Sequence, residues 1–135
     1  QLKADPTTKN NHGNTPLHEA SIHGQVDIAR LLLQAKADPN TKNKDGSTPL
    51  HWASSAGKVD TARLLLQANA DPATKNKNGT TPLHWASRFG HVDISRLLLQ
   101  AKADPTTKNK YGETPLHGAS NHEMKQLLES SMQVS

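Results

Sequence analysis

The sequence predicts an all-α solenoid of stacked helix-turn-helix units, with short β-hairpins projecting from one edge. Glycine recurs at a spacing of 33 residues, at Gly13, Gly46, Gly79 and Gly112. Two residues after each of these glycines comes the run Thr-Pro-Leu-His. A fixed period of this length marks an array in which one supersecondary unit stacks on copies of itself. Such an array offers a long surface and no single enclosed centre, so it favours binding over catalysis.

The period divides the chain into full and partial units of one repeat domain. The full repeats are residues 10–42, 43–75 and 76–108, and residues 109–135 form a divergent C-terminal capping repeat. The first nine residues match the tail of a later repeat, residues 100–108. We therefore interpret residues 1–9 as the tail of a truncated repeat, and the chain as a fragment of a longer array.

Within a full unit, the order of residues predicts two helices. Thr15 is placed as an N-cap, and Pro16 as the first helical residue, where its missing N–H costs nothing. Gly24 can end this helix in the left-handed conformation. A second helix is predicted from about Val26 to Ala35, because apolar residues recur there with a helical period. Both helices are shorter than the ~12–15 residues that an isolated helix needs, so we expect them to bury their apolar faces against neighbouring repeats.

The remaining part of each unit, residues 38–45 in the first, is rich in Pro, Asn, Lys and Asp and predicts a turn-forming hairpin. The last unit departs from the pattern. Glu123 stands where the other units have the glycine between helices, and Leu127 and Leu128 arrive three residues early. We expect residues 118–135 to form a C-terminal cap with a short second helix.

This pattern resembles the ankyrin repeat. The matching features are the hairpin glycine, the Thr-Pro-Leu-His-x-Ala run, the glycine between helices, the Leu-Leu-Leu of the second helix and the Ala-Asp that follows. The resemblance covers essentially the whole chain, and it implies protein binding through a concave groove lined by the first helices. Where the family usually has glycine after the second helix, this chain has Lys3, Lys36, Asn69 and Lys102. We expect slight backbone strain at those positions.

Composition limits the cellular compartments and the protein classes that fit this chain. The chain has no cysteine, which excludes disulfides and thiolate metal sites and fits a reducing compartment. It is polar, with a mean hydropathy of −0.76, and no run of about 18 apolar residues could span a membrane. We expect a monomeric intracellular protein of the cytoplasm or nucleus, with a secreted effector as the alternative.

Histidine is abundant, but its pattern does not favour a metal site. Four histidines share one repeat position, so each layer of the stack carries one imidazole: His18, His51, His84 and His117. A zinc site needs three or four ligands that meet at about 2 Å. The family resemblance implies that these histidines are structural, with hydrogen bonds across the hairpin and to the next repeat. The other four are scattered over predicted surface positions: His12, His23, His91 and His122.

The sequence predicts neither an enzyme nor a cofactor. Serine, histidine and aspartate recur with the repeat frame, whereas a catalytic triad needs one asymmetric constellation with an oxyanion site. The glycines are isolated, and no GxxxxGK[ST] phosphate loop occurs.

The hairpins are predicted to carry a basic ridge. Lys44, Lys77 and Lys110 each lie two residues after another hairpin lysine, and the formal net charge is +4. Three interpretations stay open. The ridge is a solvated face that keeps hairpin edges from pairing, or it contacts an acidic protein partner, or it binds nucleic acid. We rank nucleic acid last, because aromatic residues that could stack on bases make up only 3% of the chain.

The most informative residues are those that break the repeat. Trp52 and Trp85 occupy equivalent positions in adjacent repeats, where the first repeat has Glu19 and the fourth has Gly118. Tryptophan, tyrosine and arginine are the usual hot spots of interfaces. We predict a partner-binding site on the groove and the hairpin tips: Trp52, Trp85, Arg88, Phe89 and Tyr111, with Lys44, Lys77 and Lys110. The alternatives are that each tryptophan packs between repeats, or that the chain is a spacer segment with no partner of its own.

Overall fold

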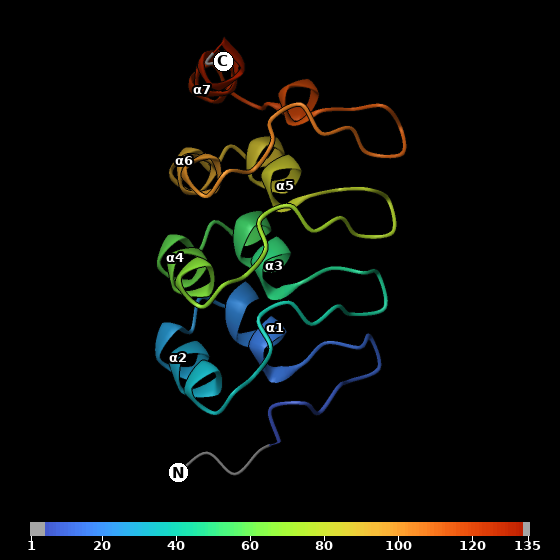
Figure 1. The fold of residues 1–135 in the computed structure, drawn as a ribbon, viewed down its shortest axis with the longest axis vertical. Coiled ribbons are helices and arrows are strands. Elements are labelled where there is room, and N and C mark those ends of the chain that lie inside the picture. The colour runs from blue at the N-terminus through green and yellow to red at the C-terminus, as the bar shows by residue number, and fades with distance from the viewer. Residues whose placement is uncertain (1–4, 134–135) are drawn as a thin grey trace.

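The computed structural model describes residues 5–133 and forms a stack of repeats with two columns of helices (Figure 1). The inner column, next to the loops, contains α1 (Pro16–Ile22), α3 (Pro49–Ala56), α5 (Pro82–Arg88) and the 3-10 helix η1 (Pro115–Gly118). The outer column contains α2 (Val26–Gln34), α4 (Val59–Gln67), α6 (Val92–Gln100) and α7 (His122–Gln133). The predicted all-α solenoid is confirmed.

The predicted β-hairpins are loops, and residues 5–133 contain no strand. Each loop donates a single backbone hydrogen bond to the loop before it, from Lys44 N–H to the His12 carbonyl at 3.0 Å in the first junction. The bonds at the next two junctions start from Lys77 and Lys110. One bond per junction is too few for the alternating ladder of a β-sheet. It is enough to hold the loops in register along the stack, on the right in Figure 1.

The inner helices begin and end as their residues predict. Thr48 is the N-cap of α3, its hydroxyl accepts from the His51 N–H, and Pro49 occupies the first turn. Gly57 ends the helix with a φ of 73°, a left-handed conformation that costs a glycine little. The same capping arrangement recurs at the start of α1 and α5.

The core lies between the two helical columns. The inner helices contribute Leu17, Leu50 and Leu83, all fully buried. In the outer helices only the middle residue of each Leu-Leu-Leu run is fully buried, as Leu32, Leu65 and Leu98. Leu31 is 52% exposed. The three leucines of each run therefore contribute unequally to the repeat interface: one lies in the core, and the other two lie at the edge of the core.

The C-terminal unit differs from the prediction. Its second helix, α7, is not short but has 12 residues, while its first helix is reduced to the four residues of η1. The Asn121 side chain accepts a hydrogen bond of 2.8 Å from the Met124 N–H, so the chain re-enters a helix early. Met124 and Leu128, one turn apart, then reach the core at 0% exposure. The three missing residues thus come from the first helix, because the linker of residues 119–121 is as long as that of residues 23–25.

The predicted strain after the second helices is present. Lys36, Asn69 and Lys102 adopt φ values of 73°, 73° and 75°. Left-handed backbone costs a residue with a side chain roughly 1–2 kcal/mol. Lys3 lies outside the described residues.

The position of a helix in the stack sets its stability against local opening. In this chain α4 contacts α2 on one side and α6 on the other, whereas α2 contacts a single outer helix, α4. We therefore expect the amides of residues 64–66 to exchange with deuterium more slowly than those of residues 31–33, because local opening is easiest where fewest contacts are lost. Native-state hydrogen exchange measures this difference, and equal protection of the two segments would contradict it.

Within residues 5–133, no helix combines the length and the apolar character that crossing a membrane requires.

Candidate functional site

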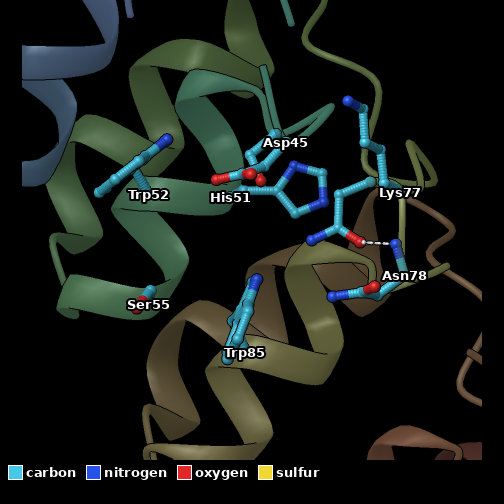
Figure 2. Close-up of a pocket in the computed structure, with 9 residues that line it drawn as sticks. Asp45, His51, Trp52, Ser55, Lys77, Asn78 and Trp85 are labelled. Atoms are coloured by element: carbon cyan, nitrogen blue, oxygen red, sulfur yellow. Dashed lines mark hydrogen bonds between the residues drawn. The ribbon is translucent and has the colours of Figure 1, made fainter. Parts of the chain in front are cut away.

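A groove of about 440 Å³ opens between the second and third repeats, beside the inner helices. Trp52 of α3 and Trp85 of α5 line it, and Asp45, Lys77 and Asn78 line it from the loops (Figure 2). The wall is therefore aromatic, and the rim is polar and carries one charge of each sign. Four further residues complete the lining: Ser47, His51, Ser55 and Asn76.

The helix register explains why the two tryptophans face the groove. The residues next to them, Ala53 and Ala86, are buried in the core at 0% exposure, and a turn of about 100° per residue places the tryptophans at the edge of that buried face. Both tryptophans are half-buried, with part of each ring packed on the protein and part open. This arrangement brings together Trp52, Trp85 and Lys77 of the predicted site.

Phe89 and Arg88 extend the aromatic wall. The Phe89 ring stacks on Trp85 with 5.9 Å between centroids and 14° between planes. The Arg88 guanidinium carbon lies 5.9 Å from the centroid of the Trp85 ring, within the range of a cation–π contact. Phe89 is 49% exposed, which leaves much of this surface open to a partner. Trp85 and Arg88 also line a second hollow of about 280 Å³, between the third and fourth repeats.

The remaining predicted site residues do not line either hollow. Tyr111 lies on the last loop with 67% of its surface exposed, and the Lys110 ammonium is 5.3 Å from its ring centroid. Lys44 is exposed on its loop. These residues share the loop side of the stack with the groove, but they are separate from it.

The prediction omitted several residues of the groove rim. Asp45 and Asn78 vary between repeats, and that variation was the signal that could have placed them with the tryptophans. Asn76 gave no such signal, because every repeat has asparagine there. Its side-chain oxygen accepts from the Asn78 and Thr80 N–H groups, so it shapes the loop that forms the rim.

The repeated histidines connect adjacent repeats, as predicted. The Thr48 N–H donates to His51 Nδ1 at 3.0 Å, and His51 Nε2 contacts the Thr80 carbonyl of the next repeat at 2.9 Å. A neutral ring with its proton on Nε2 satisfies both contacts. Burial lowers the pKa of His51 to about 4, and it also lowers the pKa of His18 and of His84.

His91 is not the scattered surface residue that we predicted. Its ring is half-buried, and its Nε2 lies 3.0 Å from the Ser55 carbonyl of the preceding repeat. A Cβ at Gly57 would lie 2.7 Å from this ring, so the glycine leaves room for the histidine. His91 is thus part of the repeat frame.

Charge is distributed unevenly between the two sides of the stack. On the outer helices, each arginine pairs with an aspartate of its own helix, as in the 3.0 Å contact of Arg63 with Asp60. Within residues 5–133, the loop lysines make no ion pair. The positive charge therefore concentrates on the loop side. No three histidine, aspartate or glutamate side chains of the described residues come together as metal ligands.

A search of curated proteins by sequence finds no match to this chain. A family model of ankyrin repeats matches it in three overlapping copies, at residues 1–76, 35–109 and 69–134. The matches follow the stacked repeats of the structure, and the chain belongs to the ankyrin repeat family.

Proposed function

We propose that this chain is a non-catalytic binding module that holds a protein partner in the groove between Trp52 and Trp85. Ankyrin repeats are generally protein–protein interaction modules. The observation that carries this proposal is the exposed aromatic surface of the third repeat. Trp85, stacked on Phe89 and flanked by Arg88, forms an open cluster of the residue types that dominate binding energies.

The packing alternative explains this surface less well. The same helix position holds Glu19 in the first repeat and Gly118 in the fourth, so the repeat frame tolerates a charge or no side chain there. Neither tryptophan is fully buried, although a residue required for the core would be. Partner binding in the groove explains why tryptophan occupies this helix position in the second and third repeats and not in the first and fourth.

We further propose that the loop lysines contact acidic groups of the same partner, and that one chain binds as a monomer in the cytoplasm or nucleus. The supporting observation is the row of exposed Lys44, Lys77 and Lys110, held in register by the bonds between loops. A polyanion such as nucleic acid is the second candidate for this row. Its binding would weaken steeply with added salt, because counterions are released from the polyanion.

Trp85→Ala tests the groove. We expect the variant to lose at least ~2 kcal/mol of affinity for the partner, as truncated hot-spot residues do. We expect it to lose less stability than the ~3–5 kcal/mol of an emptied core aromatic site. The partner is first identified by affinity capture and mass spectrometry, and the affinity is then measured by titration beside a urea melt of the same variant.

Met132→Ala is the control, since Met132 is an exposed apolar residue on α7, away from both hollows. Its affinity for the partner should equal that of the unchanged chain. A Trp85→Ala variant that unfolds easily but binds normally while folded would show that the tryptophans serve packing, and the proposal would fail.

A further inference from the structure

We propose that the groove binds a proline-rich segment in the polyproline II conformation, with two prolines three residues apart, one packed on each tryptophan. This inference rests on the proposed function, since it names the chemistry of the partner that the groove receives. Three features of the groove support it: its period, the unpaired indole donor of Trp52 and its balance of charge.

The first feature is the period. α3 and α5 pack directly against each other, and packed helices lie about 8–10 Å apart. Trp52 and Trp85, at equivalent positions of these helices, repeat with that period. A polyproline II helix has three residues per turn and rises 3.1 Å per residue, so residues three apart lie on one side at about 9 Å. One turn of such a segment therefore matches the step from one tryptophan to the next.

The second feature is the hydrogen-bonding character of the groove. The Trp52 indole nitrogen is buried and has no acceptor among residues 5–133. A buried donor without a partner costs roughly 1–3 kcal/mol. Figure 2 shows the nitrogen ends of both indole rings on the side nearer the loops, where the polar rim lies. Since Trp52 is only half-buried, its ring can tilt to present the N–H to a ligand.

A polyproline II segment supplies the acceptor that the Trp52 indole N–H lacks. Its carbonyl groups make no hydrogen bonds within the segment, so they are free to accept. Proline has no N–H that would need an acceptor in return. Both indole N–H groups and the Lys77 ammonium line the groove as donors, whereas the Asp45 carboxylate and the hydroxyls of Ser47 and Ser55 are its acceptors.

The third feature is charge. Asp45 and Lys77 both line the rim, so their fixed charges offset each other inside the groove. An uncharged segment therefore fits inside the groove, while Lys44 and Lys110, which do not line it, remain for acidic groups elsewhere on the same partner. Polyproline II segments also lose little conformational entropy on binding, which suits a shallow aromatic surface.

The length of the aromatic surface limits the motif. The equivalent helix positions outside the second and third repeats hold Glu19 and Gly118, so two proline sites lie in line along the inner helices. Phe89, stacked on Trp85, widens the second site. The geometry points to a Pro-x-x-Pro core as the shortest segment that occupies both tryptophans.

Nuclear magnetic resonance of the full chain tests this proposal, because the two tryptophans of the sequence give two indole N–H signals, both from the groove. The probe is a blocked decaproline peptide, and a glycine-serine peptide of equal length is the control. We expect decaproline to shift both indole signals saturably and the control peptide to leave them unchanged. Indole signals that stay in place up to millimolar decaproline, or that shift equally with both peptides, would overturn the proposal.

Trp52→Phe separates the hydrogen bond from stacking, because it keeps an aromatic ring and removes the indole N–H that lacks an acceptor. We expect it to weaken decaproline binding about 2- to 10-fold, the equivalent of one net hydrogen bond of ~0.5–1.5 kcal/mol. Glu19→Ala, at the same helix position of the first repeat, should leave the affinity unchanged. An unchanged affinity in Trp52→Phe would contradict the role of the indole donor.

The two proposals fail in different ways. If decaproline does not bind while a captured protein partner loses affinity for Trp85→Ala, the groove binds proteins but not polyproline II segments. If decaproline binds and the captured partner has the same affinity for Trp85→Ala as for the unchanged chain, the groove binds proline while that partner contacts another surface.

Discussion

Leu32→Ala is expected to lower the free energy of unfolding by about 3–5 kcal/mol, the largest effect of any single substitution proposed for this chain. Leu32 lies in α2 with 0% of its surface exposed, so truncation removes buried methyl groups and leaves a cavity. A small domain has a total stability of only about 5–15 kcal/mol. Such a loss would therefore leave the first repeat close to unfolding at ambient temperature.

Leu31→Ala is the matched control, because it makes the same chemical change one residue earlier in the same helix. Leu31 is 52% exposed, and we expect the variant to lose about 1 kcal/mol or less. Urea unfolding of both variants and of the unchanged chain measures the difference. Equal losses would mean that the two leucines bury similar areas in solution, which contradicts the packing described here.

The sequence predicted the repeat frame well because each of its signals is local. Thr48, Pro49 and Gly57 occupy the cap and stop positions that their backbone preferences favour. The repeated histidines were assigned to the frame through the family resemblance, and their contacts with the next repeat bear this out. Local chemistry that recurs at a fixed spacing can be assigned without knowing the tertiary structure.

The sequence predicted less well wherever a feature depends on packing between repeats. Nothing local distinguishes Leu31 from Leu32, and their burial follows from how α2 rests on α4. The bond of His91 to the Ser55 carbonyl joins residues of different repeats, so no short motif encodes it. In the last unit, three missing residues could shorten either helix, and the cap that Asn121 provides for α7 decided between them.

The candidate site shows the same division. Variation at one helix position identified Trp52 and Trp85, but it could not show which loop residues complete the groove between them. Asp45 and Asn78 come from two loops whose register is set by the bonds between repeats. Tyr111 was predicted at a hairpin tip of the same binding surface, and the structure places it on the last loop, where it lines neither hollow.

Acidification from about pH 7.5 to about pH 5 is expected to lower the free energy of unfolding by about 2 kcal/mol through His51 alone. Burial holds the pKa of His51 at about 4 in the folded chain, against the ordinary histidine value of 6.5. Between these values the unfolded chain binds more protons than the folded one, so stability falls as the pH falls. The contribution of His51 is fully present above about pH 6.5 and is lost as the pH approaches 4.

The contacts of His51 give this shift a structural cause. A second proton would have to occupy Nδ1, which already accepts the Thr48 N–H at 3.0 Å. The new Nδ1–H would then face the Thr48 N–H, donor against donor, and the Thr48 hydroxyl at 3.0 Å would be its nearest acceptor. Burial lowers the pKa of His18 and of His84 as well, so these residues add to the loss of stability below about pH 6.5.

His51→Gln separates the contribution of His51 to the pH dependence of stability from that of the other titrating groups. Glutamine has an amide that can still donate a hydrogen bond, but it does not titrate. The variant is expected to be less stable at neutral pH, while its stability falls less steeply between about pH 7.5 and pH 5. The lowered pKa values of Asp5 and Asp104 affect stability only at more acidic pH, because carboxylates titrate near pH 4 and below. Urea melts at several pH values measure both slopes. If the stability of the variant and of the unchanged chain falls with the same slope against pH, His51 does not couple folding to proton binding. The description of its ring as neutral and buried at the repeat junction would then be wrong.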